Sequence, residues 1–237
     1  MPRAYQPPPT VHNVQADARR GRGSATRSAG RFEKFRTEAF DDGWDTADEQ
    51  PAPLRTVVQA DTARSIITYN QSPDIHFDRS INPYRGCEHG CVYCFARPSH
   101  GYLGLSPGLD FESRLFAKFD APELLAKELR KKGYQPAMIA LGVNTDCYQP
   151  IEREHRITRR LLEVLSAFNH PVSIITKSQL IQRDIDILAD MAERQLVMAA
   201  VSITSLDREL ARRMEPRAAT PKRRLATLEA LNKAGVP

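Results

Sequence analysis

The sequence has few cysteines and no long apolar run, and each absence excludes a class of protein. Four cysteines in 237 residues are too few for a small scaffold held together by disulfides. No stretch approaches the roughly 18 consecutive apolar residues of a membrane-spanning helix. The first residues, MPRAYQPPPTVHNV, lack the apolar centre of a secretory signal peptide. With 41% hydrophobic residues, the sequence predicts a globular cytoplasmic protein without a membrane segment.

The sequence also has little excess charge, a net +5, and that charge is unevenly placed. Residues 1–36 hold seven Arg and one Lys against two acidic residues, a net +6, whereas residues 37–49 hold six acidic residues and no basic one. Few spaced apolar residues occur here, so we expect a flexible charged tail over residues 1–60 and a folded core over 61–237. The functional alternative is a basic arm that binds phosphates, which makes nucleic acid a candidate partner.

Strand and helix patterns alternate through the rest of the chain. Short apolar runs predict buried strands, and apolar residues three or four positions apart predict helices. The predicted strands are 80–84, 137–143, 172–177 and 196–203; the predicted helices are 121–132, 157–168, 181–192, 206–214 and 221–235. Nearly continuous apolar strands between helices indicate an α/β fold with a parallel sheet. Polar residues follow each strand, which favours an active site at that edge of a barrel.

Three cysteines lie close together in NPYRGCEHGCVYCFARP. Cys87, Cys91 and Cys94 form a C-x3-C-x2-C pattern on a glycine-containing loop. Thiolates are soft ligands that favour iron–sulfur clusters, zinc or copper(I). A closed zinc site needs a fourth ligand, for which His89 and His100 are candidates. Three cysteines without a local fourth fit a [4Fe-4S] cluster that keeps one iron open.

The chain resembles the radical S-adenosylmethionine (SAM) superfamily. The resemblance is carried by the C-x3-C-x2-C triad, with the aromatic Tyr93 just before the last cysteine and the triad placed after the first strand of an α/β pattern. Within the superfamily the text SINPYRGCEHGCVYCFARP, NTDCYQPIERE, IITKS and MEPRA is similar to the branch of spore photoproduct lyase, over about residues 62–237. The resemblance implies a TIM-type (β/α)6 barrel. This chain holds about four β/α units of it, so we expect the C-terminal part of the barrel to be missing.

The resemblance also implies an activity. The three cysteines are expected to hold a [4Fe-4S] cluster, which binds SAM and cleaves it reductively to methionine and a 5′-deoxyadenosyl radical. A lyase acting on nucleic acid, as in DNA repair, is the implied analogue, with an electron donor such as flavodoxin or ferredoxin as partner and a monomer as the expected state. The alternatives are a non-enzymatic, zinc-binding module associated with nucleic acid, and a radical SAM enzyme that acts on RNA or a peptide.

The same resemblance assigns polar residues at the strand ends to SAM. Tyr93 is expected beside the adenine and Lys177 at the SAM carboxylate. The further candidates for contacts with SAM are Thr145, Asp146, Ser202, Glu215 and Arg217. Each has a structural alternative: Lys177 as an ordinary surface residue, for example, or a Glu215–Arg217 ion pair. Glu152 is expected to be a carboxylate at a helix start, stabilised by the helix dipole.

Cys147 is the fourth cysteine and its role stays open. Spore photoproduct lyase uses a cysteine near the end of the corresponding strand to return a hydrogen atom, and Val143 occupies that place here. Cys147 lies four residues later and is the catalytic candidate. A small buried residue is the commoner role for a free cysteine.

Overall fold

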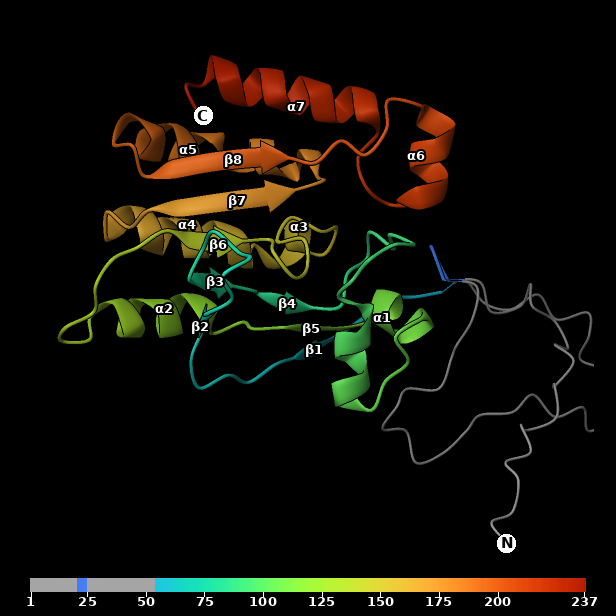
Figure 1. The fold of residues 1–237 in the computed structure, drawn as a ribbon, viewed down its shortest axis with the longest axis horizontal. Helices are drawn as coiled ribbons and strands as arrows, with labels where there is room; N and C mark the ends of the chain where they lie inside the picture. Colours follow the sequence, from blue (N-terminus) through green and yellow to red (C-terminus); the bar gives the residue numbers. More distant parts are fainter. Residues whose placement is uncertain (1–20, 25–53) are drawn as a thin grey trace, which may run out of the picture.

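The larger of two sheets carries most of the fold. The computed structural model describes residues 21–24 and 54–237 (Figure 1). In the larger sheet the strand order is β2-β3-β6-β7-β8, where β2 pairs antiparallel with β3 and the other neighbours are parallel. Its strands are β2(Ile67–Tyr69), β3(Arg79–Ile81), β6(Ile139–Leu141), β7(Val172–Thr176) and β8(Val197–Val201). Strands β6, β7 and β8 are those that the apolar runs predict. The predicted strand 80–84 is instead divided between β3 and β4(Tyr84–Arg85), which belong to different sheets.

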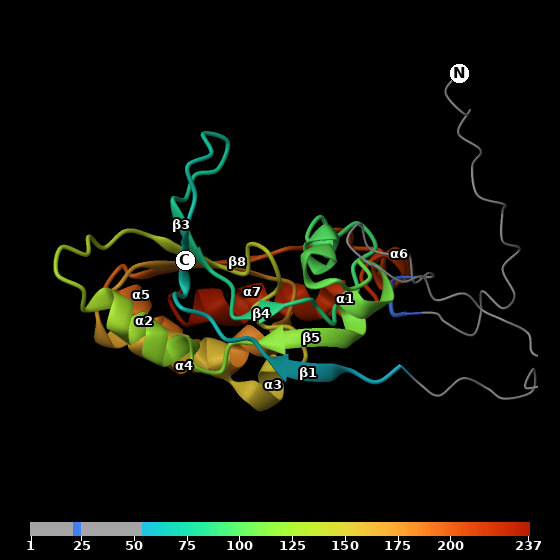
Figure 2. The same ribbon diagram turned by 90° about the horizontal axis from the view of Figure 1, so that it is seen from below.

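Helices follow the parallel strands along the chain. Figure 2 shows α2, α4 and α5 on the same side of the larger sheet. Ile81, Ile139 and Ile174 of the strands pack in one core with Leu125 and Leu161 of these helices, and all five side chains are fully buried. The helices are α2(Ala121–Leu129), α3(Glu152–His155), α4(Ile157–Ala167), α5(Ile185–Glu193), α6(Arg208–Met214) and α7(Pro221–Lys233). Thr220 caps α7 by accepting from the Arg223 N–H, as its position before Pro221 predicts.

A smaller sheet and two short helices precede α2. Its order is β1-β5-β4, with β1 parallel and β4 antiparallel to β5. The elements are β1(Val57–Ala60), β4(Tyr84–Arg85), the 3₁₀ helix η2(Arg97–Leu103), α1(Leu109–Ser113) and β5(Arg114–Ala117). A second 3₁₀ helix, η3(Gln179–Asp184), leads into α5 where a single helix over 181–192 was predicted. Strand β1 extends the folded part into residues that the sequence assigned to the tail.

The α/β class is confirmed, but a partial barrel is not. The described residues form two open sheets, with β2 and β8 at the edges of the larger one. The sheet does not close because four parallel strands are too few to curl into a barrel, and an antiparallel strand occupies one edge. Most of the predicted tail, including its acidic stretch 37–49, lies outside the described residues. Among residues 21–24 and 54–237, no helix is both long and apolar enough to span a bilayer.

Candidate functional site

The cysteine loop runs from β4 to η2 and is anchored on both sides. We use "cysteine loop" for residues 86–96. Gly86 has φ +75°, and a Cβ there would lie within 2.8 Å of Phe111 O and His100 Cε1. Cys87 N donates to Phe111 O at 2.9 Å, and Val92 N donates to Met214 O at 3.0 Å. The loop is therefore held between α1 and the end of α6.

The three loop cysteines line one cavity of about 110 Å³. The loop forms one wall of this cavity, together with Tyr93 and His89, and the residues that follow β6 and β7 form the other. Among the predicted residues, the cavity wall includes Tyr93, Thr145, Asp146 and Lys177 along with the three cysteines. Polar groups at the carboxyl ends of neighbouring parallel strands are thus brought to the same place as the thiols.

All three loop cysteines are free thiols, and burial raises the pKa of two of them, Cys87 and Cys91. Burial, and then the charge of Asp146, raise the pKa of Cys87 far above that of an ordinary thiol. Burial also raises the pKa of Cys91 to about 11, although the nearby Lys177 opposes this shift. Thiols in such a setting become thiolates only when a cation binds them.

Tyr93 is fixed by a carboxylate that follows α6. Its hydroxyl donates to Glu215 Oε1, and Thr204 Oγ1 donates to the same oxygen at 2.6 Å. Lys177 Nζ lies 6.0 Å from the centre of the Tyr93 ring. Burial and the bond to Glu215 raise the pKa of the Tyr93 hydroxyl well above its ordinary value. The ring is therefore a neutral, oriented face at the cavity, with a cation beside it.

Glu215 and Arg217 do not form the pair that the sequence suggests. Glu215 Oε2 accepts from Arg224 Nη2, and both side chains are almost completely buried. Arg217 Nη1 instead lies 2.8 Å from Glu88 Oε1, inside the cysteine loop, and its backbone N–H donates to His89 O at 3.1 Å. Glu215 therefore contacts the cavity residue Tyr93, and Arg217 contacts the cysteine loop through Glu88 and His89.

Asp146 ties together the ends of β6 and β7. It accepts from Thr176 Oγ1 and Lys177 N, each at 2.7 Å, and His89 Nδ1 lies 3.3 Å from its Oδ2. Burial opposes ionisation, but the neighbouring His89 and these hydrogen bonds lower the pKa of Asp146 to about 2. Thr145 similarly donates its hydroxyl to Tyr84 O at 3.0 Å. Both side chains line the cavity while fixing its backbone.

Ser202 and Cys147 lie outside the cavity wall. Ser202 N donates to Thr176 O at 2.9 Å, and Ser202 O accepts from Arg224 Nη1 at 2.8 Å. Cys147 is fully buried in the main hydrophobic core, and burial raises the pKa of its thiol well above the ordinary value. This placement favours the structural role of Cys147 over the catalytic one. Val143, by contrast, does line the cavity.

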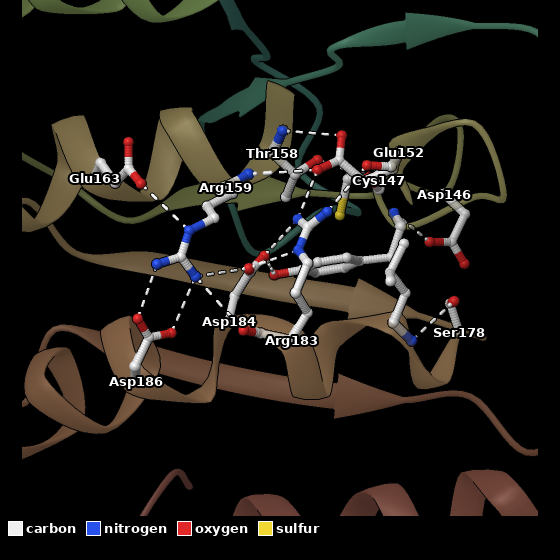
Figure 3. A network of polar contacts seen from close by, with 12 residues as sticks. Asp146, Cys147, Glu152, Thr158, Arg159, Glu163, Ser178, Arg183, Asp184 and Asp186 are labelled. Carbon is white, nitrogen blue, oxygen red and sulfur yellow. Dashed lines mark hydrogen bonds and ion pairs between the residues drawn. The ribbon is translucent and has the colours of Figure 1, made fainter. Parts of the chain in front are cut away.

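A buried ionic network supports the loop after β6 from behind (Figure 3). Arg183 Nη2 lies 2.7 Å from both Glu152 Oε1 and Asp184 Oδ2, and the two carboxylates are fully buried. Glu152 begins α3, as predicted, but it also accepts from Thr158 N at 3.1 Å and from the Tyr84 hydroxyl. It therefore caps the start of α4 and joins β4 to the loop. No local spacing in the sequence points to Arg183 or Asp184 as its partners.

Comparisons with known proteins agree with this arrangement. The family model of the radical SAM superfamily matches residues 81–237. An uncharacterized protein of Mycobacterium tuberculosis (strain ATCC 25618 / H37Rv) is 40% identical over 160 residues, which is 68% of this chain and 47% of that protein. An uncharacterized protein of Methanocaldococcus jannaschii is 27% identical over 157 residues, 66% of this chain and 56% of that protein. The chain thus spans about half the length of the curated relatives it matches.

Solved structures of spore photoproduct lyase share the fold. One with bound AdoMet and dinucleoside spore photoproduct has a TM-score of 0.54 at 17% identity, and the match covers 76% of this chain and 48% of that one. The lyase complexed with dinucleoside spore photoproduct matches with a TM-score of 0.53 at 18% identity over the same shares. At this identity the likeness concerns the fold alone.

Proposed function

The chain belongs to the radical SAM superfamily, and on that premise we propose that Cys87, Cys91 and Cys94 hold a [4Fe-4S] cluster at which SAM is cleaved reductively. One observation carries the proposal: the three thiols line a single cavity with the polar ends of β6 and β7. When bound, the cluster would supply one electron to SAM, which breaks into methionine and a 5′-deoxyadenosyl radical. The chain's own residues bind, orient and shield these groups.

The donor set fits a cluster better than a single zinc ion. Among the described residues, no three His, Cys, Asp or Glu side chains lie in an arrangement that could bind a single metal ion. Each cysteine of a cubane cluster binds a different iron, so the thiolates stand around the cluster instead of converging on a point. His100, a candidate fourth zinc ligand, is fully buried, with its Nε2 at 2.9 Å from Arg114 O. His89 lines the cavity beside Asp146.

The polar residues would then divide into two groups. Lys177 and the Tyr93 ring, which line the cavity, would receive the SAM carboxylate and adenine, and Asp146 and Thr145 would add polar surface at the same wall. Glu215 would act through the orientation of Tyr93, and Arg217 through Glu88. Ser202 would act through Arg224, which links it to Glu215. Glu215, Arg217 and Ser202 form the second group, which would position the residues that contact SAM without touching it themselves.

Anaerobic reconstitution with iron and sulfide tests the proposal. We expect brown protein with about four iron per chain, and 5′-deoxyadenosine after reduction by dithionite or a flavodoxin. Alanine variants of Cys87, Cys91 or Cys94 should lose the iron, whereas Cys147→Ala, the matched control, should keep both iron and SAM cleavage. Colourless protein with stoichiometric zinc and no 5′-deoxyadenosine would refute the proposal in favour of a zinc module.

For the substrate, we propose a nucleic acid on which the protein acts as a lyase. Support comes from the shared fold with an enzyme solved with dinucleoside spore photoproduct. Val143 at the cavity wall has no S–H to donate, so return of a hydrogen atom to the product would need another donor. The test is stimulation of 5′-deoxyadenosine formation by ultraviolet-irradiated DNA, with undamaged DNA, RNA and peptide as comparison arms. Stimulation by RNA or peptide alone would contradict a DNA substrate.

A further inference from the structure

A short N-terminal segment lies against the cysteine loop. We call residues 21–24 the clamp segment; Figure 1 draws it in blue. Its backbone turns back on itself, with Gly21 N donating to Ser24 O at 2.7 Å. Arg22 N and Gly23 N both donate to Glu112 Oε2 of α1, at 2.6 and 3.0 Å. The segment therefore holds one carboxylate with two successive backbone N–H groups.

The Arg22 side chain joins this helix to the cysteine loop. Its guanidinium donates to Glu112 O and lies 3.1 Å from Glu88 Oε1, next to Cys87. The side chain is only 12% exposed, so this is a largely desolvated contact. Glu88 and Glu112 are themselves 4% and 0% exposed. Buried carboxylates are costly unless cations and hydrogen-bond donors compensate them.

The two backbones also touch directly. A Cβ added at Gly23 would lie 1.8 Å from Gly90 O, in the cysteine loop between His89 and Cys91. Gly90 itself has φ +67°, a conformation that favours glycine, and a Cβ there would lie 2.9 Å from Arg22 Cβ. So close an approach leaves no room for a side chain on Gly23.

We propose that the clamp segment positions the cysteine loop, and that Arg22 is the residue that fixes it by bridging Glu88 and Glu112. Arg97 and Arg217 bind one each of these carboxylates, Arg97 to Glu112 at 2.6 Å and Arg217 to Glu88 at 2.8 Å. Arg22 contacts both residues: its guanidinium reaches Glu88 Oε1 and Glu112 O, and its backbone N–H reaches Glu112 Oε2. It therefore couples the loop to α1. The loop is thereby held in place before any cluster binds. The consequence for iron retention rests on the proposed function, whereas the restraint on the loop does not.

Hydrogen exchange of the whole chain, in the metal-free state, tests the restraint. In Arg22→Gln we expect the amides of residues 86–96 to exchange about tenfold faster, because the guanidinium loses its ion pair with the buried Glu88 and its hydrogen bond to Glu112 O. Peptides from β7 and β8 should be unchanged. Arg64→Gln, which removes an equal charge from an exposed position, is the matched control and should match the wild type.

Gly23→Ala provides a second variant that keeps the charge of Arg22. Its methyl group collides with Gly90 O, so the same loop amides should exchange faster. Unchanged exchange of residues 86–96 in both variants would overturn the proposal. In parallel, iron loss from reconstituted protein to a chelator should be several-fold faster in Arg22→Gln. If the wild type binds no iron, the proposed function fails, and the exchange data still decide whether the clamp exists.

Discussion

The buried pair Glu215–Arg224 offers a stringent test of how the cavity is held together. Arg224 is 1% exposed, and its guanidinium donates to Ser202 O at 2.8 Å, to Ala219 O at 2.7 Å and to Glu215 Oε2. Arg224→Met would leave a buried carboxylate without its cation. Removing one partner of such a pair costs about 3–5 kcal/mol. We therefore expect a loss of about 4 kcal/mol in the free energy of unfolding.

Glu215→Gln should cost about 3 kcal/mol, because it leaves the buried guanidinium uncompensated while an amide oxygen still accepts from Thr204. The double variant contains neither charge, so it should lose less than the two single variants together. The expected coupling free energy is about 2–3 kcal/mol. Urea unfolding followed by far-ultraviolet circular dichroism measures all four proteins. Additivity to within about 0.5 kcal/mol would refute the view that these two charges compensate each other.

Acidification gives an independent check on the same pair. Burial raises the pKa of Glu215, but the bonds from Thr204, Tyr93 and Arg224 lower it overall, below its ordinary value of 4.5. A carboxyl group whose pKa is lower in the folded state stabilises the protein fully above the unfolded pKa, and this contribution is lost as the pH falls through the folded pKa. The stability difference between wild type and Glu215→Gln should therefore shrink below about pH 4.5. A difference that stays constant on acidification would contradict the ionised state of Glu215.

Three further outcomes follow from the contacts around the site. Gly86→Ala should lower the free energy of unfolding by about 2–4 kcal/mol, since its Cβ would lie 2.5 Å from Leu115 Cδ2. Gly104 also has a positive φ but open space around it, so Gly104→Ala should cost only about 1 kcal/mol. Equal losses in the two variants would refute the packing argument. Arg183→Met should destabilise the chain by about 3–5 kcal/mol in urea unfolding, because the fully buried Glu152 loses the guanidinium that pairs with it, while Asp184 keeps its ion pair with Arg159. Lys177→Gln should weaken SAM binding to the reconstituted protein about tenfold in calorimetry without changing its iron content; unchanged affinity would remove Lys177 from the SAM site.

Strands β6, β7 and β8 of the larger sheet were predictable because a continuous apolar run leaves a local mark, although β7 and β8 each keep exposed residues and are not buried on both faces. Residues 139–141 are almost fully buried, and the corresponding run AMIALGV is apolar throughout. The strands β1, β4 and β5 leave no such mark. They are two to four residues long, and β1 becomes a strand only by pairing with β5, far along the chain. Because such pairing depends on tertiary contacts, the local sequence does not predict strand β1.

The site shows the same division between local and distant signals. The three cysteines lie within eight residues, so one short motif predicts that they gather. The partners that hold their loop do not follow from spacing. Glu88 meets Arg217 across 129 positions, and Arg22 meets Glu112 across 90. The MEPRA text suggests a neighbouring Glu215–Arg217 pair. The fold instead pairs Arg217 with the buried Glu88, 129 positions away, and Glu215 with the buried Arg224, nine positions later.

Two charged groups therefore hold the cysteine loop from different sides, and their independence can be measured. Arg22 bridges Glu88 to α1, whereas Glu215 fixes Tyr93 through its hydroxyl. Within residues 21–24 and 54–237, no residue is hydrogen-bonded to both groups, so the effects of Arg22→Gln and Glu215→Gln on exchange of the 86–96 amides should be additive in free energy. Additivity within about 0.5 kcal/mol would mean that the loop is held at two separate points. Coupling well above that value would mean that it moves as one rigid unit, so that loosening either end releases the whole loop.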